Sequence, residues 1–169
     1  MITTLRRIAA TTAVTGVVAG GMALSMGAAS ANPSEAPCTA ADVNVTVTKE
    51  PSAATGHEAF RIDYTAATPH TNCKLQGVPA DVVFTDHGAP IHGVKVIPDG
   101  GVAEPVNLTA HSPAHSYLLQ ATQAAPHATI PTSVDFALPS TAPNTREVAA
   151  WPAGEQIKGV LQVTPITQS

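Results

Sequence analysis

The sequence predicts an all-β domain, built as a sandwich or a barrel of short strands. Apolar residues fall in brief runs, most of which alternate with polar residues at a period of two. Pro, Gly, Asn and Asp bound these runs, as turn residues bound strands. The 15 prolines leave few windows of a dozen residues free of proline, and an interior proline costs a helix about 3 kcal/mol.

Residues 1–31 are expected to be a cleaved signal peptide. Arg6 and Arg7 precede an apolar stretch from Ile8 to about Met26, and the small residues that follow place the cleavage between Ala31 and Asn32. Threonines and glycines dilute the stretch, which disfavours a membrane span. The general secretory route is expected, and the arginine pair leaves the twin-arginine route open. The exported part would then begin with a short linker, 32–37, and continue as one domain, 38–169.

The charge of the exported part excludes some partners. Without the two leader arginines, six basic residues face twelve acidic ones, so the net charge is −6 with neutral histidines. Such a surface does not neutralise phosphates, and no nucleic acid partner is expected. A charged fraction of 12% also argues against a coiled coil or a disordered tail.

Cys38 and Cys73 are the only cysteines, and both follow the leader. In an oxidising compartment such a pair is expected to form a disulfide. Lipidation of Cys38 is the alternative, but Glu35-Ala36-Pro37 before it lacks the small apolar pattern that lipidation needs. Without a C-x-x-C spacing, metal binding by the pair is not expected.

Two long strands are expected at Val43–Val47 and Phe60–Tyr64, where apolar and polar residues alternate. Shorter strands are expected at 73–77, 81–85, 93–97, 105–109, 116–122, 133–138 and 159–164. The turns at 86–88 and 98–101 combine Asp with Gly and are typical of hairpin connections. Residues 139–158 are expected to be a long loop, held down by Val148 and Trp151.

The order of several motifs resembles that of a known family. In order along the chain, these motifs are Cys38, Gly56-His57, an alternating strand to Tyr64, the segment Asn72 to Pro79 and the turn at 86–88. They follow one another as in domain of unknown function 4232, a family of actinobacterial exported proteins and lipoproteins. The resemblance covers about 38–166, and Cys73 to Pro79 is its most specific part. It implies an immunoglobulin-like antiparallel β-sandwich outside the cell membrane, with no catalytic residues to carry over. The sequence departs from many members by lacking further cysteines and a lipid-modified cysteine.

No catalytic motif is present. G-x-S-x-G, G-x-x-x-x-G-K-[ST] and G-x-G-x-x-G are all missing, and His57-Glu58 begins an H-E-x-x-H motif that Arg61 breaks. The protein is therefore not expected to be an enzyme, and no cofactor is expected.

The seven histidines are the one chemical oddity of the sequence. His111 and His115 are four residues apart, and His87 and His92 flank a predicted turn near Asp86. Imidazole and carboxylate groups in such turns suit Zn or Cu(II). The alternative is that these histidines are scattered and solvated.

Two functions follow from these observations. The first is an exported, non-enzymatic domain, secreted or in the cell envelope, that binds a protein or cell-wall partner through its loops. The second is a protein that binds a small ligand or a transition metal through its histidine-bearing turns.

Overall fold

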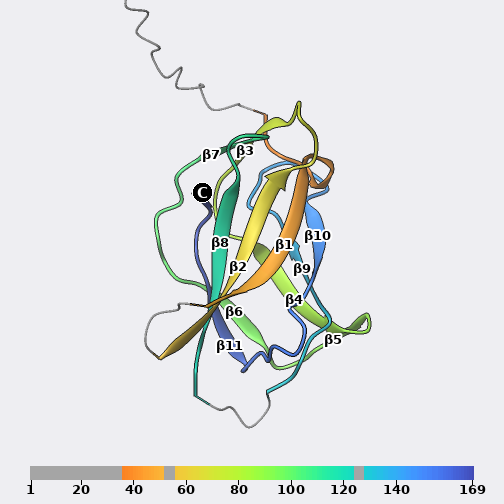
Figure 1. Ribbon diagram of the computed structural model, residues 1–169, viewed down its shortest axis with the longest axis vertical. Coiled ribbons are helices and arrows are strands. Elements are labelled where there is room, and N and C mark those ends of the chain that lie inside the picture. The colour runs from red at the N-terminus through yellow and green to blue at the C-terminus, as the bar shows by residue number, and fades with distance from the viewer. Residues whose placement is uncertain (1–35, 52–55, 124–127) are drawn as a thin grey trace, which may run out of the picture. The chain divides into compact units, whose positions relative to one another are not determined.

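The computed structural model describes residues 36–51, 56–123 and 128–169, which form an all-β sandwich (Figure 1). The predicted signal peptide, its cleavage site at Ala31 and Asn32, and most of the predicted linker lie outside the described residues. Within them, one 3₁₀ turn, η1 (Ala40–Asp42), is the only helical element. No helix of the described segments has the length and hydropathy that a membrane span needs.

The larger sheet has the strand order β1 (Val43–Glu50), β2 (His57–Ala66), β8 (Ala114–Ala121), β11 (Val160–Val163) and β6 (Lys95–Pro98). A short strand, β12 (Thr167–Gln168), also pairs with β8. The neighbours are antiparallel except β11 and β6, which run parallel. Val45 pairs with Tyr64, and Phe60 pairs with Leu118, so the alternating residues of the long strands share one buried face.

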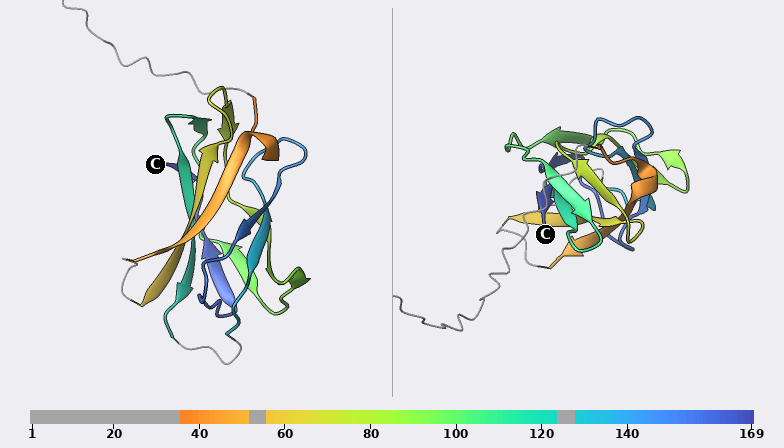
Figure 2. Two further views of the ribbon diagram at one scale, coloured as in Figure 1. Left: turned by 45° about the vertical axis from the view of Figure 1, so that its right-hand side comes forward. Right: turned by 90° about the horizontal axis from the view of Figure 1, so that it is seen from above.

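The second sheet has the order β10 (Arg146–Ala150), β9 (Ser133–Ala137), β4 (Ala80–Asp86) and β5 (Ala89–Pro90), and all its pairs are antiparallel. A separate pair, β3 (Asn72–Leu75) and β7 (Val106–Thr109), lies at one end. Figures 1 and 2 show β1, β2 and β8 in one layer and β4, β9 and β10 in the other. The predicted antiparallel sandwich is confirmed, except that β6 pairs in parallel with β11.

All nine predicted strands are present, and three further strands, β5, β10 and β12, were not predicted. The prediction of a loop over 139–158 was wrong at β10, which pairs with β9. Val148 in β10 is 65% exposed and does not hold this segment down, whereas Trp151 is buried. β10 forms by cross-strand pairing with β9, and Ala149 is its one buried residue.

The two predicted hairpin turns have different outcomes. At Asp86–Ala89, both His87 and Gly88 have positive φ, as a two-residue hairpin turn requires, and β4 and β5 pair across them. Residues 98–101 do not form a hairpin, because β6 pairs with β11 and β7 pairs with β3. There the Asp99 carboxylate accepts a hydrogen bond from the Gly101 N–H at 2.9 Å.

Aromatic side chains fill the core between the sheets. The Phe60 and Trp151 ring centroids are 4.4 Å apart, and Phe84 packs edge-on to Trp151 at 5.1 Å. Tyr64 packs edge-on to Phe136, and its hydroxyl lies 2.9 Å from Ser116 Oγ. Because Tyr64 is fully buried, burial raises the pKa of its hydroxyl, so the group stays neutral.

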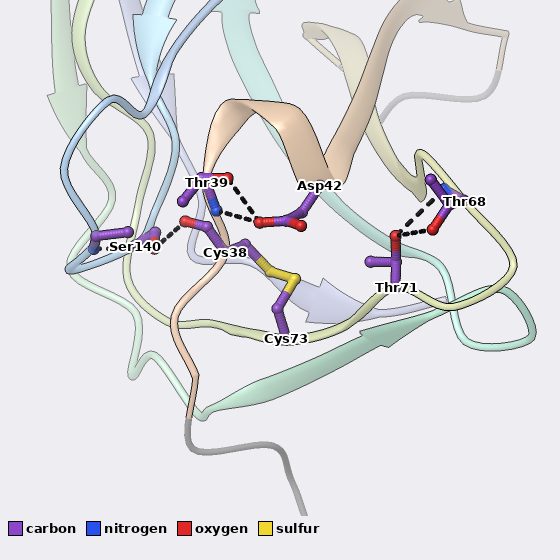
Figure 3. Close-up of a disulfide and its surroundings, with 8 residues drawn as sticks. Cys38, Thr39, Asp42, Thr68, Thr71, Cys73 and Ser140 are labelled. Atoms are coloured by element: carbon purple, nitrogen blue, oxygen red, sulfur yellow. Dashed lines mark hydrogen bonds between the residues drawn. A yellow bond between two sulfur atoms is a disulfide. The ribbon is translucent and has the colours of Figure 1, made fainter.

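The predicted disulfide between Cys38 and Cys73 is confirmed, with the two Cα atoms 4.9 Å apart (Figure 3). Cys38 N–H donates to the Lys74 carbonyl at 3.0 Å, and Ser140 Oγ donates to the Cys38 carbonyl at 2.6 Å. Next to the disulfide, the Asp42 carboxylate accepts hydrogen bonds from the Thr39 hydroxyl and N–H, and these bonds lower its pKa. The disulfide thus ties the chain before β1 to β3 at the end of the sandwich where β3 and β7 lie.

Candidate functional site

His87 and His92 lie in the turns that surround β5, and both are exposed. Nδ1 of His87 lies 2.7 Å from the Asp86 carboxylate, as the sequence suggested, although 86% of the His87 side chain is accessible. The turn itself is formed by His87 and Gly88, whereas Ala89 and Pro90, which also lie between the two histidines, form β5.

His111 and His115 differ in their surroundings. His111 lies in the turn between β7 and β8, whereas His115 lies on β8. The two ring nitrogens of His115 contact hydroxyls, Nδ1 with Ser169 Oγ at 2.9 Å and Nε2 with Thr167 Oγ1 at 3.3 Å. Burial, followed by the nearby Arg61 charge, lowers the pKa of His115. His115 is therefore held as a neutral hydrogen-bonding group beside β12.

The described residues contain no group of three or more His, Cys, Asp or Glu side chains placed to hold a metal ion together. His87, His92, His111 and His115 accordingly provide no assembled centre in these parts of the chain. His127 lies outside the described residues.

A partly buried polar cluster lies at the start of β2 and the end of β8. Lys158 Nζ contacts Glu58 Oε2 at 2.9 Å, and the side chains of these two residues are 12% and 24% exposed. Gln120, which is 2% exposed, donates to the same Glu58 oxygen and to the Gln156 carbonyl, and accepts from the Lys158 N–H. Burial raises the pKa of Glu58, but the contacts with Lys158 and Gln120 outweigh it and lower the pKa overall. With its polar atoms bonded to one another, this cluster is suited to closing the sandwich and not to catalysis.

Residues of β4, of β6 and of the segment around β5 line an apolar groove, which we call the β4–β6 groove. It consists of two adjoining hollows of about 360 and 380 Å³ that share Val82. The first hollow is lined by Val78, Pro79, Ala80, Asp81, Val82, Val96, Pro98 and Val163. The second is lined by Val82, Val83, Phe84, Pro90, Ile91, His92, Gly93 and Val94. Five of the partly buried aliphatic side chains that pack against the core, Val78, Val82, Ile91, Val94 and Val96, line this groove.

Asp81 is the one acidic residue in the lining of the β4–β6 groove. Its φ is +50°, an uncommon conformation for a residue other than glycine, and the pairing of β4 with β9 is irregular between Ala80 and Val83. Such bulges redirect side chains and are frequent beside functional sites. Among the described residues no ion pair involves the Asp81 carboxylate. Arg146 Nη1 donates to the Asp81 backbone carbonyl at 3.5 Å, and Arg146 Nη2 lies 2.6 Å from Asp135 Oδ1.

Two other hollows are less suited to binding. One, of about 320 Å³, is lined by small Thr, Ala and Pro residues at 65–69, 109, 110 and 113, without a charged side chain. The other, of about 250 Å³, lies on the outer face of the larger sheet, where Ile97 and Val160 are 45% and 55% exposed beside Leu119. Neither hollow combines an aliphatic lining with a carboxylate, as the β4–β6 groove does.

The model of the family described as domain of unknown function, DUF4232, matches residues 38–167. The chain belongs to the DUF4232 family. No protein of curated function and no solved structure matches the chain. The resemblance drawn from Cys38, Cys73 and the segment to Pro79 is thereby confirmed at the level of the family.

The DUF4232 match includes both cysteines and every residue of the β4–β6 groove. In this DUF4232 domain the sequence pattern pointed to Glu58 only as part of a broken H-E-x-x-H motif, and it did not point to Asp81 as a functional residue. For Glu58 a signal existed, because extending the alternation of Phe60, Ile62 and Tyr64 backwards places Glu58 on the buried face. For Asp81 the sequence holds no such signal, since its importance depends on a backbone conformation and on the approach of β6.

Proposed function

We propose that this DUF4232 domain is exported and acts without catalysis as a binding module, in the extracellular space or the cell envelope, for a protein or cell-wall partner. The observation that carries this proposal is the β4–β6 groove, whose walls expose aliphatic side chains continuous with the core. An apolar hollow with few polar groups is the usual form of a binding site.

Export is supported by the leader pattern of residues 1–31 and by the disulfide, which persists in oxidising compartments. Protein recovered outside the cell is expected to begin at Asn32. N-terminal sequencing of the secreted and the wall-associated fractions measures this. A mature protein that retains the leader would contradict export by this signal.

Binding through the groove is tested by photo-crosslinking in the native culture. A photoreactive residue replaces Val82 in one variant and Val148, which is 65% exposed on β10, in a matched control. A specific adduct with the Val82 probe and not with the Val148 probe supports the proposal. Adducts of equal yield from both positions, or from neither, contradict it.

A further inference from the structure

Two strands border the β4–β6 groove with backbone edges that no described strand covers. On the side away from β9, β4 pairs with β5 only at Thr85 and Asp86, and Ile91 N–H adds one bond to the Phe84 carbonyl. Residues 80–83 of β4 therefore have no strand partner on that side among the described residues. β6 is the last strand of its sheet and pairs only with β11.

These free edges match one kind of ligand chemistry. Unpaired N–H and C=O groups along a strand form hydrogen bonds with another extended backbone, and hollows beside them accept alternate side chains. Val82 of β4 and Val96 of β6 both line the first hollow, so free strand edges and an apolar hollow occur along the same short segment. The proline residues Pro79 and Pro98 at its border limit the pairing to a few residues.

The negative charge of Asp81 favours an extended partner that carries a positive charge. Asp81 supplies a carboxylate without an ion-pair partner among the described residues, beside aliphatic walls. A second copy of this chain is disfavoured, because antiparallel pairing of two β4 edges near Val82 would bring two Asp81 residues close together. The full chain also has a net charge of −4. A segment with a basic side chain complements this site.

We propose that the β4–β6 groove binds an extended peptide segment that pairs with the free edge of β4 or β6, inserts aliphatic side chains into the groove and places a Lys or Arg side chain against Asp81. This inference rests on the proposed binding function and names its partner class. The peptide is a segment of another protein, recognised through its backbone and its one positive charge.

The first experiment is a selection from a phage-displayed library of random seven-residue peptides on the exported protein. The enriched peptides are expected to alternate Val, Ile or Leu with polar residues and to carry Lys or Arg at one position. Their affinity should fall at least tenfold with Asp81→Asn, because Asn removes the charge yet tolerates the positive φ. Asp86→Asn, on the same strand outside the groove, is the matched control and should bind as the wild type does.

The second experiment maps the contact by NMR with one enriched peptide and a ¹⁵N-labelled exported protein. Amide shifts and slower hydrogen exchange are expected at 80–83 and 94–98, and peptides N-methylated at alternate backbone positions should lose binding. The proposal is overturned if no peptide is enriched, if Asp81→Asn binds equally, if N-methylation has no effect, or if the shifts centre on Leu119 and Val160. An adduct at Val82 in culture combined with any of these outcomes rejects the peptide inference alone, whereas no adduct rejects the binding function itself.

Discussion

Phe60 on β2 and Trp151 after β10 pack with their ring centroids 4.4 Å apart, at an interplanar angle of 44°. Phe60 is completely buried and Trp151 is 5% exposed, so this contact joins the two sheets at the centre of the sandwich. Trp151 also donates a hydrogen bond from its indole N–H to the Glu155 carbonyl at 3.0 Å. The indole is therefore fixed by packing on one side and by a polar contact on the other.

Replacing Phe60 with alanine is expected to lower the free energy of unfolding by about 3–5 kcal/mol, as aromatic core truncations do. Denaturant unfolding followed by tryptophan fluorescence measures the change, because Trp151 is the single tryptophan. Val148→Ala, at an exposed position of β10, serves as the control and should change stability by less than about 0.5 kcal/mol. An unchanged midpoint for Phe60→Ala would refute the role of this contact.

Removing the disulfide by the double substitution Cys38→Ala and Cys73→Ala is expected to cost about 4 kcal/mol. The bond closes a loop of 35 positions, and its loss returns that loop entropy to the unfolded chain. Chemical denaturation of the variant, with reduced wild type as a second reference, measures the effect. A thiol assay on the unfolded, unreduced wild type should detect no free thiol, and two reactive thiols would contradict the pairing.

The substitution Lys158→Met is expected to reduce stability by about 1–2 kcal/mol at pH 7, since it leaves the Glu58 carboxylate partly buried without its cation. Folding lowers the pKa of Glu58. The stabilisation that the charged Glu58 carboxylate gives the folded state is therefore present above the unfolded pKa and is lost as the pH falls through the folded pKa. The difference between variant and wild type should narrow below about pH 4. Lys95→Met, at an exposed residue of β6, should show neither the loss nor the pH dependence.

Glu147→Gln is expected to stabilise the protein at neutral pH. Glu147 lies on the inward face of β10, paired with Phe136, and burial raises the pKa of its carboxyl. A raised folded pKa means that ionisation favours unfolding, so the penalty is absent below the unfolded pKa and grows as the pH rises through the folded pKa. Thermal melts should show a higher Tm for the variant at pH 7 and equal values near pH 4. Glu104→Gln, at an exposed residue, is the control, and a matching rise there would rule out this explanation.

Much of the fold could be predicted because local patterns and tertiary contacts agree. Phe60, Ile62 and Tyr64 recur at a period of two, and the same residues line the buried face. β10 could not be predicted, because Val148 points to solvent and the strand exists through its pairing with β9. The turn at 98–101 was misassigned since Asp and Gly specify a local bend and not the strand that follows it in space.

The sequence by itself determined the all-β class, the single pair of cysteines, the family motifs and the low charge, because these depend on composition and on neighbours along the chain. Only the tertiary structure decided which groups meet. It placed β6 beside β4 and left the Asp81 carboxylate without an ion pair among the described residues. It also joined Glu58 to Lys158 across 100 positions. It also brought no set of histidines together as a metal centre within those residues. Contacts between distant strands follow from sheet order and register, which a period of two along one strand does not specify.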